Sequence, residues 1–223
     1  MKETSFLLKN KRVLLLGDPD AANAVVLLAG EEETGFLKEI YTRAETLTGA
    51  PFCLVSVPVA RWNEELTPWE APGLRKGERF TSGAKETLAF LTEELLPALK
   101  ADRVFLCGYS LAGLFALWAC RETDAFSGAA GVSPSLWFPG FSEYAAAHLP
   151  RCRSVYLSLG DKEEQAKHPV LKTVGDAVRA EYARLSLLPL SSALEWNPGG
   201  HFQDPPGRLA RGIAWLLDRT KRQ

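Results

Sequence analysis

Short apolar runs alternate with longer amphipathic segments along most of this chain. Runs such as residues 25–28, Val-Val-Leu-Leu, are apolar at every position, as expected of a strand covered by helices on both faces. The strand-length runs cover residues 12–17, 24–30, 52–57, 103–108, 127–132, 154–159 and 194–196. Helical patterns cover residues 34–47, 83–100, 111–120, 169–185 and 209–217. The alternation predicts an α/β fold with a mostly parallel central sheet and helices on both faces.

The beginning of the chain departs from this alternation. Residues 5–9 and 12–17 are joined by Asn10 and Lys11, which predicts a tight antiparallel hairpin at the edge of the sheet. Residues 68–80 form the one long irregular segment, and loops of that length are often functional. Because 223 residues without a linker or repeat suit one folding unit, we expect a single domain over residues 1–223.

The composition excludes several function classes. A net charge of −1 and the lack of a basic patch argue against nucleic acid and membrane surfaces as partners. The N-terminus has no signal-peptide pattern and no segment approaches about 18 apolar residues, so we expect a cytoplasmic protein. The four cysteines form no C-x-x-C pair, and no residue cluster suggests a metal or cofactor site. Cys53 and Cys107 lie in apolar runs, which predicts buried free thiols.

Residues 107–114, Cys-Gly-Tyr-Ser-Leu-Ala-Gly-Leu, lie where a predicted strand runs into a predicted helix. A serine exposed on so tight a turn needs small residues two positions before and after it, and Gly108 and Ala112 meet that need. The turn forces Ser110 into a sparsely populated backbone region. The N–H of Leu111, at the helix start, can donate to an oxyanion. Ser110 is therefore predicted to be a nucleophile; the alternative is a serine that only caps the helix.

A serine nucleophile needs a general base, and the chain has three histidines. His148 ends a helical stretch and His168 precedes a proline at a helix start, positions that suggest structural roles. His201 lies in the loop between the last strand and the last helix. In α/β hydrolases the histidine comes from this loop, in the chain order serine, acid, histidine. His201 is the predicted base.

The acid is expected shortly after the strand over residues 154–159. Glu163 stands three residues after Gly160, the common spacing in α/β hydrolases, and is favoured. Asp161 and Glu164 are the alternatives, and Glu195 is a fourth candidate within the last strand. The acid would hold the imidazole tautomer and stabilise the imidazolium.

A second oxyanion donor is expected from the loop that follows residues 24–30. The backbone N–H of Glu31, or else of Glu32, is the candidate, because Gly30 permits the turn that brings this loop over Ser110. The prediction concerns the backbone only.

Three tryptophans and one arginine are candidates for substrate binding. Trp62, Trp69 and Trp137 lie at or beyond the carboxyl ends of strands, where ligands gather in open α/β sheets. Ordinary packing explains them equally well. Arg61 could contact an anionic substrate group, or it could pair with a nearby glutamate.

Several segments, taken in order, carry a family resemblance. They are Arg-Trp-Asn-Glu-Glu-Leu-Thr-Pro at 61–68, the helix pattern at 83–97, Gly-Tyr-Ser-Leu-Ala-Gly-Leu-Phe-Ala at 108–116, Ser-Pro-Ser-Leu-Trp at 133–137, Gly-x-x-Glu at 160–163 and Gly-Gly-His-Phe at 199–202. The chain resembles the esterase family that includes esterase D and the ferric-siderophore esterases. The resemblance implies an α/β-hydrolase fold, with Ser110 as nucleophile and His201 as base.

Members of that family hydrolyse carboxylic esters, including siderophore lactones, S-formyl thioesters and acyl sugars, and some related proteins transfer acyl groups. Many members have glycine where Ala112 stands, and larger members carry insertions that 223 residues cannot hold. We therefore expect a version with no lid domain that cleaves small-molecule esters or thioesters without a cofactor. The alternatives are an acyltransferase that uses the same site and a catalytically idle binding protein.

Overall fold

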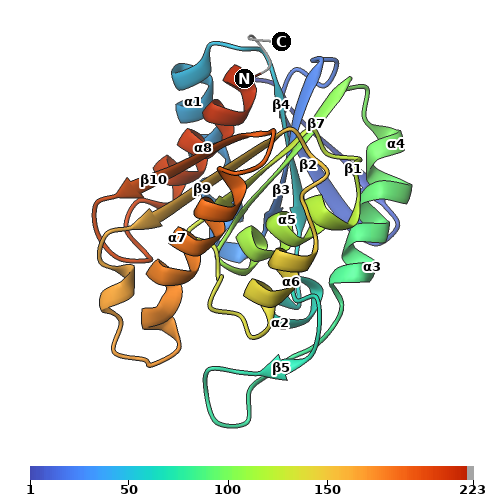
Figure 1. The fold of residues 1–223 in the computed structure, drawn as a ribbon. Helices are drawn as coiled ribbons and strands as arrows, with labels where there is room; N and C mark the ends of the chain where they lie inside the picture. Colours follow the sequence, from blue (N-terminus) through green and yellow to red (C-terminus); the bar gives the residue numbers. More distant parts are fainter. Residues whose placement is uncertain (220–223) are drawn as a thin grey trace.

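An eight-stranded sheet crosses the molecule in the order β1-β2-β4-β3-β7-β8-β9-β10 (Figure 1). The computed structural model describes residues 1–219 and, for Glu31 and Glu32, only the backbone. The strands are β1 (Glu3–Leu8), β2 (Lys11–Gly17), β3 (Asn23–Ala29), β4 (Cys53–Pro58), β7 (Arg103–Tyr109), β8 (Gly128–Val132), β9 (Ser154–Gly160) and β10 (Ser191–Asn197). All neighbours from β4 to β10 run parallel, whereas β1 and β2 form an antiparallel hairpin at the edge. The predicted sheet and hairpin are confirmed.

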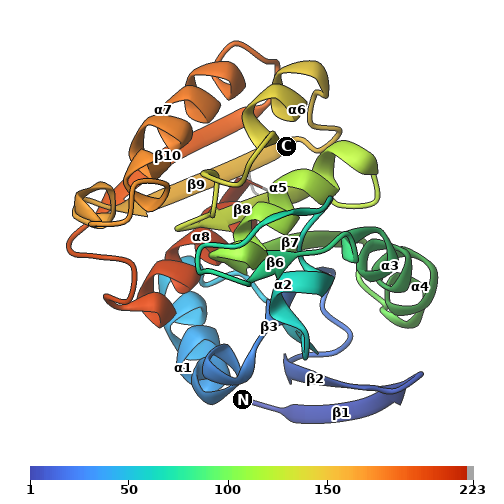
Figure 2. The same ribbon diagram turned by 90° about the horizontal axis from the view of Figure 1, so that it is seen from below.

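Helices cover both faces of the sheet (Figure 2). The helices α1 (Glu31–Thr48) and α8 (Pro205–Arg219) lie on one face, and α3 (Ala84–Ala89), α5 (Leu111–Glu122), α6 (Phe141–Ala147) and α7 (Val174–Leu185) lie on the other. Alternate residues of β3 enter different cores: Val25 and Leu27 pack towards α1 and α8, while Val26 and Leu28 pack towards α5. This period of two explains why the run is apolar at every position.

The helix predicted over residues 83–100 is divided into three parts. After α3, the chain forms a π-helical segment over Phe90–Leu95 and then α4 (Leu96–Ala98). Pro97 has no backbone N–H to donate within the helix, and it lies in α4, directly after the π-helical segment. The periodicity of the leucines in residues 83–100 predicts the buried face, but it does not predict that the turn over Phe90–Leu95 is π-helical.

Other boundaries differ at the ends of elements. The strand β10 is longer than the predicted 194–196, because as an edge strand it is only partly buried and its apolar pattern is weak. The helix predicted over 169–185 begins at Val174, after a 3₁₀ turn at Leu171–Thr173. A short helix, α2 (Trp62–Glu65), was not predicted.

The long segment over residues 68–80 contains a second, two-stranded sheet. It pairs β5 (Ala71–Pro72) with β6 (Arg79–Phe80) and projects at the lower end of Figure 1. The four cysteines are buried free thiols, and burial raises the pKa of Cys53 to about 11 and that of Cys107 to about 12. No helix within residues 1–219 has both the length and the apolar character that crossing a membrane requires.

Candidate active site

The turn between β7 and α5 holds Ser110 at a positive φ of 56°, with ψ −120°. Few non-glycine residues adopt a positive φ, and such strain persists where the surrounding structure enforces it. A Cβ atom on Gly108 would lie 2.2 Å from the backbone carbonyl of Ala112, so the position two before the serine must be glycine. The small residues that the sequence places around Ser110 therefore serve this tight turn.

The Ser110 hydroxyl faces an imidazole. Oγ of Ser110 lies 3.2 Å from Nε2 of His201 and 3.3 Å from Oγ of Ser135. Leu111 is the first residue of α5, where a backbone N–H has no acceptor within the helix. This N–H is thus available, beside the serine, to an oxygen that becomes negatively charged.

Glu163 lies behind His201. The Nδ1 atom of His201 is 2.7 Å from Oε2 of Glu163. A carboxylate at this position favours the tautomer with a proton on Nδ1, which leaves the lone pair of Nε2 directed at the Ser110 hydroxyl. The structure thus brings together the serine, the histidine and the favoured acid, in the geometry of a proton relay.

The other oxygen of Glu163 is surrounded by donors. Oε1 accepts hydrogen bonds from Oγ of Ser133 at 2.7 Å, the N–H of Gly160 at 2.8 Å and Nη1 of Arg208 at 2.9 Å. Burial opposes ionisation of this carboxyl, but the hydrogen bonds from His201, Ser133 and Gly160 outweigh it and hold the pKa of Glu163 below its ordinary value. The carboxylate is therefore charged at neutral pH.

Arg208, on α8, connects the acid to the loop that carries the histidine. Its side chain is almost fully buried, and Nη2 donates to the carbonyls of Pro198 at 3.0 Å and Gly200 at 2.9 Å. The hydroxyl of Tyr109 donates to the carbonyl of His201 in the same loop. Sequence reasoning missed Arg208; the available signal was a charged residue next to Leu209, on the inner face of an amphipathic helix.

The other acid candidates have different partners. Asp161 accepts from the N–H of Gly199 at 2.8 Å, so it braces the histidine loop from outside. Glu164 forms an ion pair of 2.8 Å with Arg179 on α7. Glu195 accepts from the hydroxyl of Tyr156 at 2.7 Å. Among the four carboxylates, Glu163 is the one in contact with His201.

The two remaining histidines lie in local structural contacts. Nδ1 of His148 is 2.8 Å from the carbonyl of Tyr144, at the end of α6. Nε2 of His168 is 3.1 Å from the carbonyl of Leu74, in the long segment before β6. The structural roles inferred for both from the sequence agree with these contacts.

The loop expected to supply a second oxyanion donor leads directly into α1. Gly30 is the residue before the helix, and its N–H donates to Oε2 of Glu33 at 3.0 Å. Gly30 and Ser110 line the same cavity. The side chains of Glu31 and Glu32 lie outside the described part of the chain, and the Glu31 N–H stays a prediction as the second donor.

A cavity of about 530 Å³ opens over Ser110 and His201. Its size is that of an ordinary small-molecule site. Trp62, at the start of α2, lines it, and its contact with substrate stays a prediction. The lining residues are Gly30, Glu33, Phe36, Ile40, Val59, Ala60, Trp62, Tyr109, Ser110, His201, Phe202, Pro205, Pro206 and Leu209.

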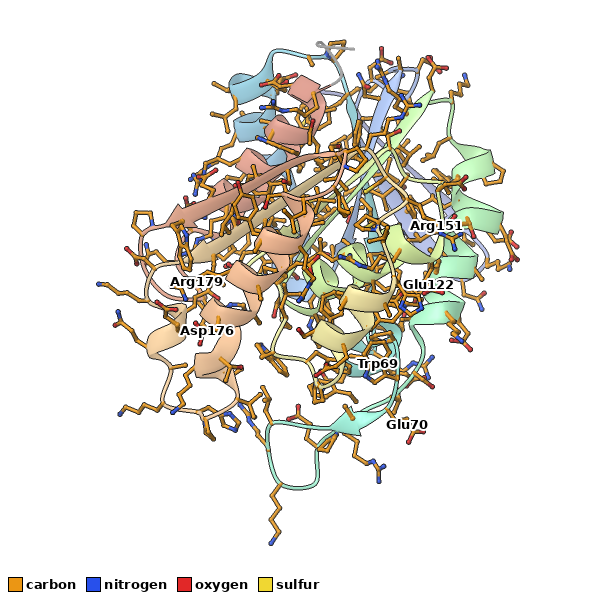
Figure 3. The ribbon with its side chains drawn as sticks, in the orientation of Figure 1. Trp69, Glu70, Glu122, Arg151, Asp176 and Arg179 are labelled. Atoms are coloured by element: carbon orange, nitrogen blue, oxygen red, sulfur yellow. The ribbon has the colours of Figure 1, made fainter. Side chains whose placement is uncertain are left out.

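Trp69, Trp137 and Arg61 do not line this cavity, and their contacts are those of the packing and ion-pair alternatives. Nε1 of Trp69, the tryptophan labelled in Figure 3, donates to the carbonyl of Pro139 at 2.8 Å. The Trp69 ring packs on Tyr144 of α6.

Trp137 packs against Phe80, with 6.0 Å between the ring centroids. Arg61 forms an ion pair of 2.8 Å with Glu64 on the surface. Trp69, which follows β4, therefore packs against α6, and Trp137, which follows β8, packs against β6. Of the three tryptophans, Trp62 is the one that shares a cavity with Ser110.

Comparison with protein families matches residues 19–185 to a model described as "Putative esterase". Among solved structures, an IroE-like serine hydrolase from Shewanella oneidensis has a TM-score of 0.79 and 19% identity, over 97% of this chain and 80% of that one. The siderophore hydrolase EstA from Aspergillus nidulans has a TM-score of 0.72 and 19% identity, over 98% and 94%. The enterochelin esterase from Shigella flexneri has a TM-score of 0.70 and 21% identity, over 99% and 59%. Comparison with curated proteins by sequence gives no match.

Proposed function

The chain belongs to the putative esterase family, and from this membership we propose that it hydrolyses carboxylic esters through an acyl-enzyme on Ser110. The observation that carries the proposal is the continuous contact from Oγ of Ser110 to Nε2 of His201 and from Nδ1 of His201 to Glu163. Serine, imidazole and carboxylate in this order activate a hydroxyl that is otherwise a weak nucleophile. Small-molecule esters and thioesters are the proposed substrates.

In the first half of the reaction, Oγ of Ser110 attacks the ester carbonyl carbon while Nε2 of His201 takes the hydroxyl proton. The carbonyl oxygen becomes an oxyanion, which the N–H groups of Leu111 and Glu31 would stabilise. His201 then gives its proton to the departing alcohol or thiol, and the acyl group stays on Ser110.

In the second half, water replaces the alcohol. His201 takes a proton from this water, the resulting hydroxide attacks the acyl carbon, and the protonated His201 returns a proton to Oγ as Ser110 leaves. The carboxylic acid is released and the free serine is restored. Glu163, ionised at neutral pH, stabilises the imidazolium present in both halves and fixes its orientation.

A fluorophosphonate probe tests the nucleophile, because it phosphonylates a serine only when a base activates it. We expect the wild type to be labelled and Ser110→Ala to stay unlabelled. Ser135→Ala is the matched control, since its hydroxyl lies 3.3 Å from Oγ of Ser110, and we expect it to keep the label. Equal labelling of the wild type and Ser110→Ala would assign the reactivity to another residue.

A further inference from the structure

Two exposed aromatic side chains lie at the cavity over Ser110. Phe36 projects from α1 with 43% of its surface exposed, and Phe202, directly after His201, is 82% exposed. Aromatic side chains of this size are usually buried, because exposure to water forfeits their large hydrophobic contribution. Two of them, brought to one cavity from segments about 165 positions apart, indicate an apolar ligand that covers them.

The rest of the cavity wall has the same character. Trp62, Ile40, Val59 and Leu209 are further apolar residues that line the cavity. The polar side chains of the wall are few, and Ser110 and His201 are already assigned to the proposed chemistry. An apolar pocket with a few convergent polar groups holds its ligand chiefly by the area removed from water.

The charge of the cavity is also informative. Among the described residues that line it, none is a lysine or an arginine, whereas the carboxylate of Glu33 belongs to the wall. A carboxylate or phosphate on the substrate would therefore lose water without gaining a cation, which costs free energy. The wall selects for neutral groups.

We propose, as a refinement that rests on the proposed ester hydrolysis, that the substrate is a neutral ester bearing an aryl or medium-length alkyl group. Phe36, Phe202 and Trp62 contact that group, and the two phenylalanines determine the preference for its length. Each methylene placed against this wall is expected to raise kcat/KM by up to about fourfold, until the cavity is filled.

The test compares kcat/KM for nitrophenyl acetate, butyrate and octanoate. For the wild type, we expect octanoate to exceed acetate by at least about tenfold, from the burial of its methylenes. In the double variant Phe36→Ala/Phe202→Ala, we expect about a tenfold loss for octanoate and a loss below about threefold for acetate. Leu187→Ala is the matched control, because Leu187 is 85% exposed and lies outside the cavity; it should change neither value.

Two further comparisons of substrates show on which side of the ester the apolar group binds and whether it must be neutral. Acetate esters of methanol and benzyl alcohol show whether the aromatic pair favours the alcohol side. The singly charged nitrophenyl ester of succinate, close in length to butyrate, tests neutrality, and we expect it to react at least about tenfold more slowly than butyrate.

The refinement is wrong if the double variant keeps the octanoate-to-acetate ratio and the benzyl-to-methyl ratio of the wild type, or if the succinate ester reacts as fast as butyrate. Failure of the proposed hydrolysis is a separate outcome, in which the wild type hydrolyses none of these esters and takes no fluorophosphonate label. In that case the proposed hydrolysis itself is wrong, and the refinement falls with it.

Discussion

The two sides of Ser110 are built in opposite ways. On the acid side, Glu163 and Arg208 are nearly fully buried and joined at 2.9 Å, and each also bonds to the backbone around it. On the substrate side, the cavity wall is largely apolar and ends in Phe36 and Phe202, which remain exposed. One side is a closed polar network, and the other is an open apolar surface.

The difference separates two tasks. A buried charge pair with satisfied hydrogen bonds has few alternative arrangements, so it fixes the imidazole against the serine at the cost of removing two charges from water. An open apolar wall places little constraint on the orientation of a ligand, and it favours ligands according to the apolar area that they bury against it. Changes on the acid side are therefore expected to alter catalysis and stability together, and changes on the substrate side to alter substrate preference alone.

The largest effect is expected at the residue between the two sides. His201→Ala removes the base, and by analogy with other triads hydrolysis of nitrophenyl butyrate should fall by about 10⁴- to 10⁶-fold. His148→Ala is the control, since that ring contacts the end of α6, and its activity should stay within about twofold of wild type. A wild-type rate in His201→Ala would remove this histidine from the mechanism.

Glu163→Gln should reduce kcat by about 10³- to 10⁴-fold, as substitution of the triad acid by its amide does elsewhere. The amide can present its NH₂ group to Nδ1 of His201, which favours the wrong tautomer. Arg208 also loses its buried counter-charge, so the free energy of unfolding should fall as well. Glu164→Gln serves as the control, because that half-buried carboxylate pairs with Arg179 instead. Full activity in Glu163→Gln would contradict the relay.

Arg208→Met tests the acid side without touching the reacting atoms. The change leaves Glu163 buried without its cation and frees two loop carbonyls, so we expect a loss of about 3–5 kcal/mol in the free energy of unfolding, measured with urea. The pKa of Glu163 should rise, because the ionised form loses a favourable charge. An NMR titration of the Glu163 carboxyl carbon measures this rise in pKa, which a purely structural role would not produce.

The pH dependence of wild-type stability has a defined sign. The pKa of Glu163 is lower in the folded protein than in the unfolded chain, so its contribution is fully present above the unfolded value of about 4.3 and is lost as the pH falls through the folded value. In Arg208→Met the depression of this pKa is smaller, and less stability should be lost over the same acid range. If the free energy of unfolding depends on pH in the same way in Arg208→Met and in the wild type, Arg208 does not influence the ionisation of Glu163.

Local sequence patterns predict much of the fold and part of the candidate site. The strand alternation predicted the parallel sheet, and three spacing arguments picked out Ser110, His201 and Glu163, which the structure brings within hydrogen-bond distance. These features depend on neighbours in the sequence or on chain order. Their signals therefore lie in short motifs and in the order of those motifs along the chain.

The rest depends on contacts between distant segments. Arg208 reaches Glu163 from 45 positions away, and nothing beside either residue marks the pair. Trp62, Trp69 and Trp137 all follow strands, yet only the first faces Ser110, because the direction of each loop is set by what it packs against. Phe36 fits the apolar periodicity of α1, and this pattern does not distinguish it from a core residue, although 43% of its surface is exposed.

The smallest effect on stability is expected at Phe202. Because this side chain is 82% exposed, Phe202→Ala removes little buried surface, and the free energy of unfolding should stay within about 0.5 kcal/mol of wild type. Phe115→Ala, the same change at a fully buried position of α5, should cost about 3–5 kcal/mol. Urea unfolding of both variants measures the contrast. The ring of Phe202 contacts the protein edge-on at His201. A loss at Phe202 close to that at Phe115 would mean that Phe202 stabilises the fold as a core residue does, and the substrate side would then not be an open surface.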